Sequence, residues 1–318
     1  MKNFEYARAS SVDGAIRLST PESRFLAGGI DLLGEMKEYI VSPRRVIDLK
    51  LIPGLDQIDT SAPVWKLGAN VTIAEIAKNQ RINAALPGLA EAALEVGSPQ
   101  IRNVATLGGN LAQHSRCWYY RHRDLRCLKR GGSTCYAREG ENKYHSLFSG
   151  NPCISPIVSN LAVILAALDA KINVRRGDKE LTLTIGELYF DAWNNPLAHN
   201  SLLPGDLIVH VEIPTRKNRS TYLQVSEKSD FDWALVSCAA AGQNVGDRWD
   251  DLSVFLGAVA PIPYRVESPL LGSGVLSKEA IESIAESIVS KATPLAHNGY
   301  RVPIAQALIR RALTRIVS

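Results

Sequence analysis

The chain has 318 residues and a formal net charge of +4, with 46% hydrophobic and 21% charged residues. This length allows two or three subdomains with cores of their own, and the composition is that of an ordinary globular protein. The small net charge argues against a dedicated nucleic-acid binder, so we expect no nucleic-acid partner. No apolar run approaches the ~18 residues that a membrane span requires, so we expect no membrane span.

The first hundred residues alternate between strand and helix patterns. An N-terminal strand is followed by a short helix, and Thr72 with Glu75 forms a capping box at the start of a later one. A strand that ends at Leu26 leads through Gly28-Gly29 into a helix that begins near Asp31. Strands are expected at 24–26, 46–49 and 65–68, and helices at 11–18, from about 31, at 72–79 and at 86–96.

The second half begins with a helix capped by Ser159 that is apolar nearly all round to Leu168, which predicts burial. Residues 215–219 are charged and non-periodic, and they are the best candidate for a linker. The other expected elements are strands at 171–175, 180–183, 207–213, 235–241 and 252–260, and helices from Thr184, from Ser277 and over 300–316. The pattern predicts an α+β fold with a C-terminal domain at 217–318.

Two diglycine segments are candidates for phosphate contacts. Gly28-Gly29 and Gly108-Gly109 each follow an apolar stretch, and glycine lets the backbone approach an anion closely. Thr106 and Asn110 flank the second pair and carry hydrogen-bonding side chains. Neither segment is G-x-G-x-x-G or a P-loop, so a Rossmann fold or P-loop lacks support. Two such turns can hold the two phosphates of a dinucleotide from opposite sides.

Four of the five cysteines follow the second glycine pair in a C-x9-C-x7-C-x17-C pattern: Cys117, Cys127, Cys135 and Cys153. Four thiolates can hold zinc or an iron–sulfur cluster, and the lack of a close cysteine knuckle favours the cluster. The basic residues between them would offset a cluster's negative charge. Two disulfides, unrelated thiols or a nucleic-acid patch with interleaved aromatics are the alternatives. We expect the fifth cysteine, Cys238, to be a buried small hydrophobe.

Together these motifs resemble those of a known family. Phe25-Leu26-Ala27-Gly28-Gly29 followed by Asp-Leu, together with Arg-Asn-x-Ala-Thr-x-Gly-Gly-Asn-Leu, is similar to the FAD-binding subunit of the molybdenum hydroxylases, the xanthine dehydrogenase and aldehyde oxidoreductase family. The four-cysteine segment resembles the subset with an extra 4Fe-4S cluster. The resemblance implies an FAD-binding domain of the vanillyl-alcohol-oxidase (PCMH) type at 1–216, with a cysteine-rich insertion at 112–155. A CO dehydrogenase flavoprotein-type C-terminal domain would follow at 217–318.

The resemblance also implies residue roles. The first glycine segment would wrap the FAD pyrophosphate, Asn160 would contact a ribose, and Ile208 and Lys228 would lie near the flavin ring. The implied FAD contacts are Arg24, Phe25, Leu26, Ala27, Gly28, Gly29, Ile30, Asp31, Leu32, Thr106, Gly109, Asn110, Asn160, Ile208 and Lys228. The implied cluster ligands are Cys117, Cys127, Cys135 and Cys153. No catalytic acid, base or nucleophile is expected, since the cofactors carry the chemistry.

The implied function is electron transfer from iron–sulfur clusters to FAD and on to an external acceptor, within a molybdenum hydroxylase or aldehyde oxidoreductase complex. The implied partners are a molybdopterin-binding large subunit and a 2Fe-2S small subunit. A stand-alone flavin-dependent oxidase and a non-enzymatic zinc scaffold are the alternatives. The first residues show no apolar secretory core, so we expect a cytoplasmic protein. Export to the periplasm with a signal-bearing partner is the alternative.

Overall fold

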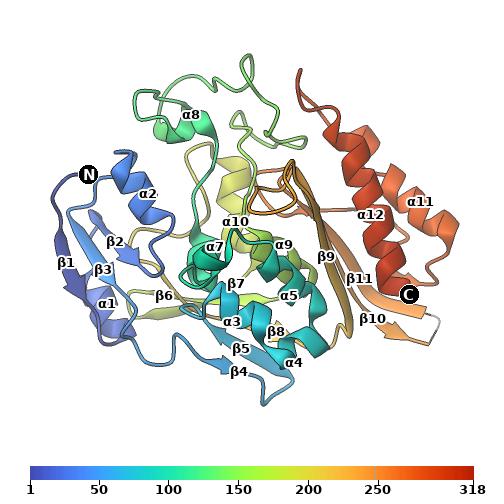
Figure 1. The fold of residues 1–318 in the computed structure, drawn as a ribbon, viewed down its shortest axis with the longest axis horizontal. Helices are drawn as coiled ribbons and strands as arrows, with labels where there is room; N and C mark the ends of the chain where they lie inside the picture. The colour runs from blue at the N-terminus through green and yellow to red at the C-terminus, as the bar shows by residue number, and fades with distance from the viewer. Residues whose placement is uncertain (247) are drawn as a thin grey trace.

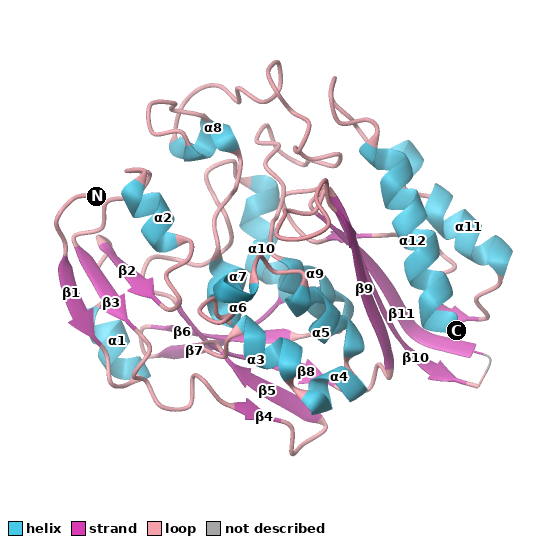
Figure 2. Cartoon of the chain, viewed as in Figure 1, coloured by secondary structure: helices cyan, strands magenta, loops and turns pink. Residues whose placement is uncertain are grey.

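The structure is a computed structural model that describes residues 1–246 and 248–318. It contains three β-sheets with helices packed around them (Figure 1 and Figure 2). Short 3-10 turns occur at Leu128–Arg130 and Val289–Lys291. The helices are α1 (Val12–Leu18), α2 (Leu32–Lys37), α3 (Ile73–Lys78), α4 (Gln80–Ala85), α5 (Pro87–Leu94), α6 (Pro99–Arg102), α7 (Leu107–Ala112), α8 (Trp118–Arg121), α9 (Asn160–Ala167), α10 (Ile185–Asn194), α11 (Lys278–Glu286) and α12 (Arg301–Val317).

The N-terminal sheet is parallel and has the order β1-β3-β2. Its strands are β1 (Glu5–Arg8), β2 (Ser23–Leu26) and β3 (Arg45–Asp48), close to the predicted positions. At the carboxyl end of β2 the chain runs through Gly28-Gly29 into α2. Ligands of open α/β sheets bind outside the carboxyl ends of parallel strands, so this topology exposes the first glycine segment to a ligand.

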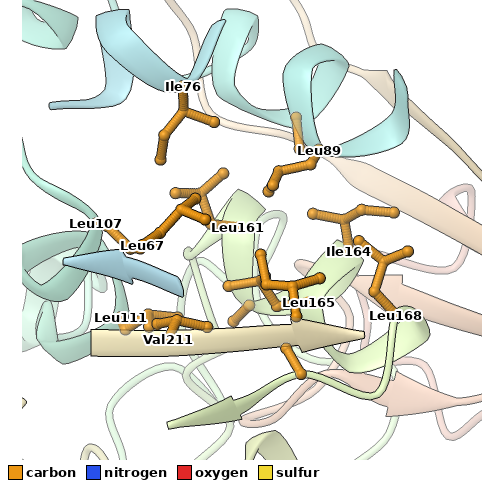
Figure 3. Close-up of a cluster of buried hydrophobic side chains, with 14 of the residues drawn as sticks. Leu67, Ile76, Leu89, Leu107, Leu111, Leu161, Ile164, Leu165, Leu168 and Val211 are labelled. Atoms are coloured by element: carbon orange, nitrogen blue, oxygen red, sulfur yellow. The ribbon is translucent and has the colours of Figure 1, made fainter. Parts of the chain in front are cut away.

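The middle sheet has the order β4-β5-β8-β6-β7 and is antiparallel. Its strands are β4 (Ile58–Asp59), β5 (Val64–Gly68), β6 (Lys171–Arg176), β7 (Lys179–Thr184) and β8 (Leu207–Pro214). Figure 3 shows side chains from this sheet, such as Leu67 and Val211, packed against Leu89 of α5 and Leu161 of α9. Six of the eight residues of α9 are apolar and at most 1% exposed, which confirms the predicted burial.

The capping box predicted at Thr72 is present, and the helix predicted from Thr184 also begins with one. Each threonine hydroxyl accepts from the backbone N–H three residues later, and the glutamate there accepts from the threonine N–H. Both helices therefore begin where the sequence places them.

The C-terminal sheet has the order β12-β11-β10-β9, with β13 paired to β11. Its strands are β9 (Arg219–Val225), β10 (Val236–Val245), β11 (Arg248–Gly257), β12 (Tyr264–Arg265) and β13 (Gly272–Gly274). Helices α5 and α9 cover one face, while α11 and α12 cover the other (Figure 1). Burial on both faces explains the continuous apolar run in β10, where Cys238 is 0% exposed as predicted.

The segment predicted as a linker at 215–219 connects the middle sheet to the C-terminal sheet, but one of its side chains is fully buried. Strand β8 ends at Pro214 and β9 begins at Arg219, and in the short connection between them Arg216 and Asn218 are exposed while Lys217 is buried. The Lys217 side chain is 0% exposed. Its Nζ donates to the Ala167 carbonyl at 2.8 Å and to Ser253 Oγ at 2.9 Å, and it lies 2.9 Å from Asp169 Oδ2. The Lys217 ammonium group is therefore held between α9 and the C-terminal sheet.

Among the described residues, no helix combines the length and the apolar character that crossing a bilayer requires.

We predict that Lys217→Ala lowers the free energy of unfolding by about 2 to 3 kcal/mol, because the substitution removes a buried charge-assisted hydrogen-bond donor and its packing. Urea denaturation of the variant and the wild type measures this difference. Lys179→Ala, at an exposed hairpin position, is the control and should change stability by no more than about 0.5 kcal/mol. Equal stability of both variants would show that the buried contacts of Lys217 do not stabilise the fold.

Candidate cofactor site

A cavity of about 530 Å³ lies beside both glycine segments. Its size falls within the range of about 300–1,000 Å³ that is typical of ligand and cofactor sites. Four stretches of the chain contribute most of its walls: residues 23–35, 95–116, 200–208 and 231–233. Leu49, Ala69, Asn70 and Asn160 complete the lining. The cavity therefore depends on the N-terminal sheet, on the middle sheet with its helices, and on a loop of the C-terminal domain.

The first glycine segment lies directly against the chain that leads to the second. A Cβ atom on Gly28 would lie 2.1 Å from the Val104 carbonyl oxygen, a distance that no side chain can adopt. Gly29 has φ of +76°, in the left-handed region that glycine favours. Both glycines are thus required by the backbone path, which confirms a tight turn at this segment.

The second glycine pair does not form the tight turn that its sequence suggests. Gly108 and Gly109 lie in the first turn of α7, and neither has positive φ. The Thr106 hydroxyl caps this helix by accepting from Gly109 N at 3.2 Å. The Asn110 side chain is 8% exposed and accepts from Ser159 Oγ at 2.6 Å. Close packing explains the glycine at 108, since a Cβ there would lie 2.9 Å from Ala69 Cβ.

Most of the FAD contacts implied by the sequence line this cavity. Leu26 does not, because its side chain packs with Met36 and Val46 in the core. Lys228 is exposed and is also absent from the lining. The predicted residues on the lining are Arg24, Phe25, Ala27, Gly28, Gly29, Ile30, Asp31, Leu32, Thr106, Gly109, Asn110, Asn160 and Ile208.

Sequence reasoning missed a chain of polar groups on one wall. Asn160 Nδ2 donates to Gln224 Oε1 at 3.0 Å, and Gln224 Nε2 donates to Glu95 Oε2 at 2.8 Å. Burial, with a smaller contribution from Asp230, raises the pKa of the Glu95 carboxyl above its usual value. No local sequence signal identifies Glu95 as a site residue, because it directly follows an apolar helix.

Two lining residues keep unpaired polar atoms. Asn70 Oδ1 and Arg116 Nε are buried and have no hydrogen-bond partner among the described residues. Arg116 also lies over the Trp233 ring, 5.0 Å from its centroid. Buried polar atoms without partners carry a desolvation cost, so they indicate a ligand that completes them.

The four cysteines of the insertion line a second, smaller cavity. Cys117, Cys127, Cys135 and Cys153 share it with His145, whose Nε2 lies 3.2 Å from Cys117 Sγ. All five cysteines of the chain are free thiols. Burial raises the pKa of the Cys117 thiol to about 12 and lowers the pKa of His145 to about 4, with Arg301 adding to the latter. A thiolate at Cys117 therefore depends on a cation bound beside it.

The basic residues of the insertion do not gather around the thiols as expected. Arg116 and Arg121 pair with Asp31, and Arg130 donates to three backbone carbonyls. Lys129 is the cation that lines the cysteine cavity, and its Nζ donates to the Ala198 carbonyl at 2.6 Å. Among the described residues, no three His, Cys, Asp or Glu side chains are arranged to hold a single metal ion.

The fold and the cavity define a two-domain protein with one large cofactor site, and comparisons with known proteins agree. The family described as "FAD binding domain in molybdopterin dehydrogenase" matches residues 2–216. "CO dehydrogenase flavoprotein C-terminal domain" matches residues 221–316. The chain belongs to the family of FAD-binding medium subunits of the molybdenum hydroxylases.

Individual relatives span almost the whole chain. The aldehyde oxidoreductase FAD-binding subunit PaoB of Escherichia coli (strain K12) is 32% identical and covers 98% of each chain. The carbon monoxide dehydrogenase medium chain of Hydrogenophaga pseudoflava is 24% identical over 98% of this chain and 96% of its own length. A solved structure of a Cu,Mo-CO dehydrogenase superimposes with a TM-score of 0.77 at 22% identity, covering 99% of this chain and 97% of that one, which shows the shared fold.

We predict opposite effects of alanine at the two glycine segments. Gly28→Ala should lower the free energy of unfolding by about 1 to 3 kcal/mol, because the new Cβ collides with the Val104 carbonyl. Gly109→Ala should leave stability unchanged or raise it by up to about 1 kcal/mol, because the residue is helical. Urea denaturation of flavin-free protein measures both, and a destabilised Gly109→Ala would contradict the helical assignment.

Proposed function

We propose that this chain is the FAD-binding electron-transfer subunit of a molybdenum-containing hydroxylase or aldehyde oxidoreductase complex, with a 4Fe-4S cluster of its own. One observation carries the proposal. Arg116 lines the large cavity and the next residue, Cys117, lines the cysteine cavity. Consecutive Cα atoms are about 3.8 Å apart, so the two sites share a wall. Groups held in these cavities would lie close enough to exchange electrons.

The large cavity is the proposed FAD site. The backbone of residues 27–30 would lie against the pyrophosphate, because the turn has no side chains at its two glycines. Asn160 would contact the ribose, and Ile208 would contribute an apolar surface to the ring system. When bound, FAD would accept electrons from an iron–sulfur centre and deliver them to an external acceptor.

The four cysteines are the proposed cluster ligands. Each thiolate of a 4Fe-4S cluster binds a different iron atom, so the sulfurs stand farther apart than around one tetrahedral ion. This is consistent with a cavity that gathers four cysteines without a single-ion geometry. Lys129, with a side chain facing the cavity, would offset part of the cluster's charge. The same geometry disfavours the zinc scaffold.

The proposed partners are a molybdopterin-binding large subunit and a 2Fe-2S small subunit. Support comes from relatives named as one part of a larger assembly, such as the carbon monoxide dehydrogenase medium chain. Another such relative is the 6-hydroxypseudooxynicotine dehydrogenase complex subunit alpha of Paenarthrobacter nicotinovorans, which is 25% identical over 98% of this chain. We propose domains at 1–216 and 217–318, and a cytoplasmic location unless a signal-bearing partner exports the complex.

Iron analysis of cysteine variants tests the cluster. Anaerobically purified wild type should hold FAD and about four iron and four sulfide per chain. Serine at Cys117, Cys127, Cys135 or Cys153 should lower both contents, because each supplies one ligand. Cys238→Ser is the matched control and should keep the full content, since Cys238 is buried in the C-terminal core. Zinc in place of iron would contradict the assignment of these cysteines to an iron–sulfur cluster.

A second prediction concerns the isolated chain. It should reduce artificial dyes when a strong reductant is supplied, because it holds the flavin. It should not oxidise aldehydes, purines or aromatic acyl-CoA esters until the partner subunits are added, because the substrate would bind at molybdenum on the large subunit. Steady-state assays with and without partners measure this. Robust substrate oxidation by the chain alone would support the stand-alone oxidase instead.

A further inference from the structure

Asp31, at the end of the first glycine segment, is held by the segment that carries Cys117. Its Oδ2 accepts from the His114 backbone N–H at 2.7 Å. Its Oδ1 accepts from Arg121 Nη2 at 2.7 Å and lies 2.6 Å from Arg116 Nη1. Both carboxylate oxygens are therefore occupied by residues that are distant in sequence and lie on either side of Cys117.

Burial alone would raise the pKa of the Asp31 carboxyl, but Arg116 and Arg121 overcome this and lower it. The carboxylate is thus charged and paired at neutral pH. Arg121 also donates from Nε to the Ser115 carbonyl at 2.7 Å, so one guanidinium ties Asp31 to the backbone two residues before Cys117. A planar guanidinium holds both acceptors at fixed positions, which an ammonium cannot do.

A second layer of contacts repeats this connection one turn further along α2. Glu35 is 2% exposed, and its Oε1 accepts from Tyr120 Oη at 2.8 Å and lies 3.1 Å from His114 Nδ1. The His114 ring stacks on His199 with centroids 4.0 Å apart. His199 Nδ1 accepts from Ser115 N–H at 3.2 Å, and burial lowers the pKa of its imidazole well below the usual value. Helix α2 and the chain around Cys117 thus form one largely buried to half-buried polar network.

We propose that Asp31 and Arg121 are positioning residues that couple the two cofactor sites, so that metal loading at the cysteines and FAD binding at the first glycine segment strengthen each other. Metal binding fixes Cys117 and the residues around it, and these hold Asp31 and the end of the glycine turn in place. The turn then needs less ordering when FAD binds, which raises its affinity. Linkage requires that FAD raises metal affinity by the same factor.

This inference rests on the proposed function, since it takes FAD and a metal cluster as the occupants. Its rival is a direct contact between Asp31 and FAD, because Asp31 lines the large cavity. Substitution of Arg121 distinguishes the coupling from a direct contact, because Arg121 binds Asp31 but does not itself line that cavity. A direct contact would make FAD affinity independent of metal loading.

The test is a titration of flavin-free protein with FAD, followed by quenching of flavin fluorescence, in metal-loaded and metal-stripped forms. Wild type should bind FAD more tightly when loaded, by a factor within the usual coupling range of about 5 to 150. Arg121→Gln should bring this ratio close to 1, chiefly by weakening binding to the loaded form. Arg121→Lys keeps the charge but cannot reach both acceptors, so its ratio should be intermediate.

Arg175→Gln is the matched control. Arg175 also bridges distant segments, with Nη2 2.6 Å from Asp13 Oδ1, but neither residue lines the large cavity or the cysteine cavity. Its ratio should equal that of wild type. A wild-type ratio near 1, or a ratio unchanged in Arg121→Gln, would overturn the coupling. Protein that binds no FAD or no iron would instead overturn the proposed function.

A measurement on metal-free protein keeps the inference testable if the chain binds FAD but no iron. FAD should slow tryptic cleavage within residues 113–155 of metal-free wild type, because a fixed Asp31 orders the segment that binds it. This protection should be lost in Arg121→Gln and retained in Arg175→Gln. Equal cleavage of the wild type with and without FAD would overturn the coupling even if the cysteines hold no iron.

Discussion

The structure depends on the close approach of two backbone segments at Gly28, where there is no room for a side chain. A Cβ atom added to Gly28 would lie 2.1 Å from the Val104 carbonyl oxygen, so the turn after β2 packs directly against the chain that enters α7. This contact joins the N-terminal sheet to the segment that enters α7, beside the large cavity. The network from Asp31 and Glu35 to the Cys117 region builds on the same junction, because α2 follows directly from the turn.

The C-terminal domain contributes to the same site through a shared core. Tyr222 and Ala239 of its sheet belong to the same buried cluster as Leu89 and Leu161. The Glu91 carboxylate on α5 accepts from Tyr222 N–H at 2.8 Å, which fixes β9 against the helix. This packing holds the 231–233 loop at the rim of the cavity. An interface this apolar indicates that the two domains move little relative to each other.

Local patterns predicted the elements well, because caps and periodicity report on neighbouring residues. Thr72, Thr184, Ser159 and Ser277 all cap helices where expected. Predictions failed where tertiary contacts decide the outcome. The burial of Lys217 depends on partners 36 to 50 residues away, which the charged segment 215–219 does not reveal. The sequence predicts a turn at Gly108-Gly109, but the pair lies at the start of a helix. Arg121 and Asp31 are 90 residues apart, so sequence spacing alone could not pair them. The glycine and cysteine motifs located both cavities because their chemistry is compact in sequence.

The most direct test is a crystal structure of the anaerobically purified protein, with diffraction data collected on both sides of the iron absorption edge. The account predicts flavin density in the cavity between the first glycine segment and α7, and an iron anomalous peak among Cys117, Cys127, Cys135 and Cys153. An iron peak elsewhere, an anomalous signal at the zinc edge among these cysteines, or a cavity without flavin would contradict it.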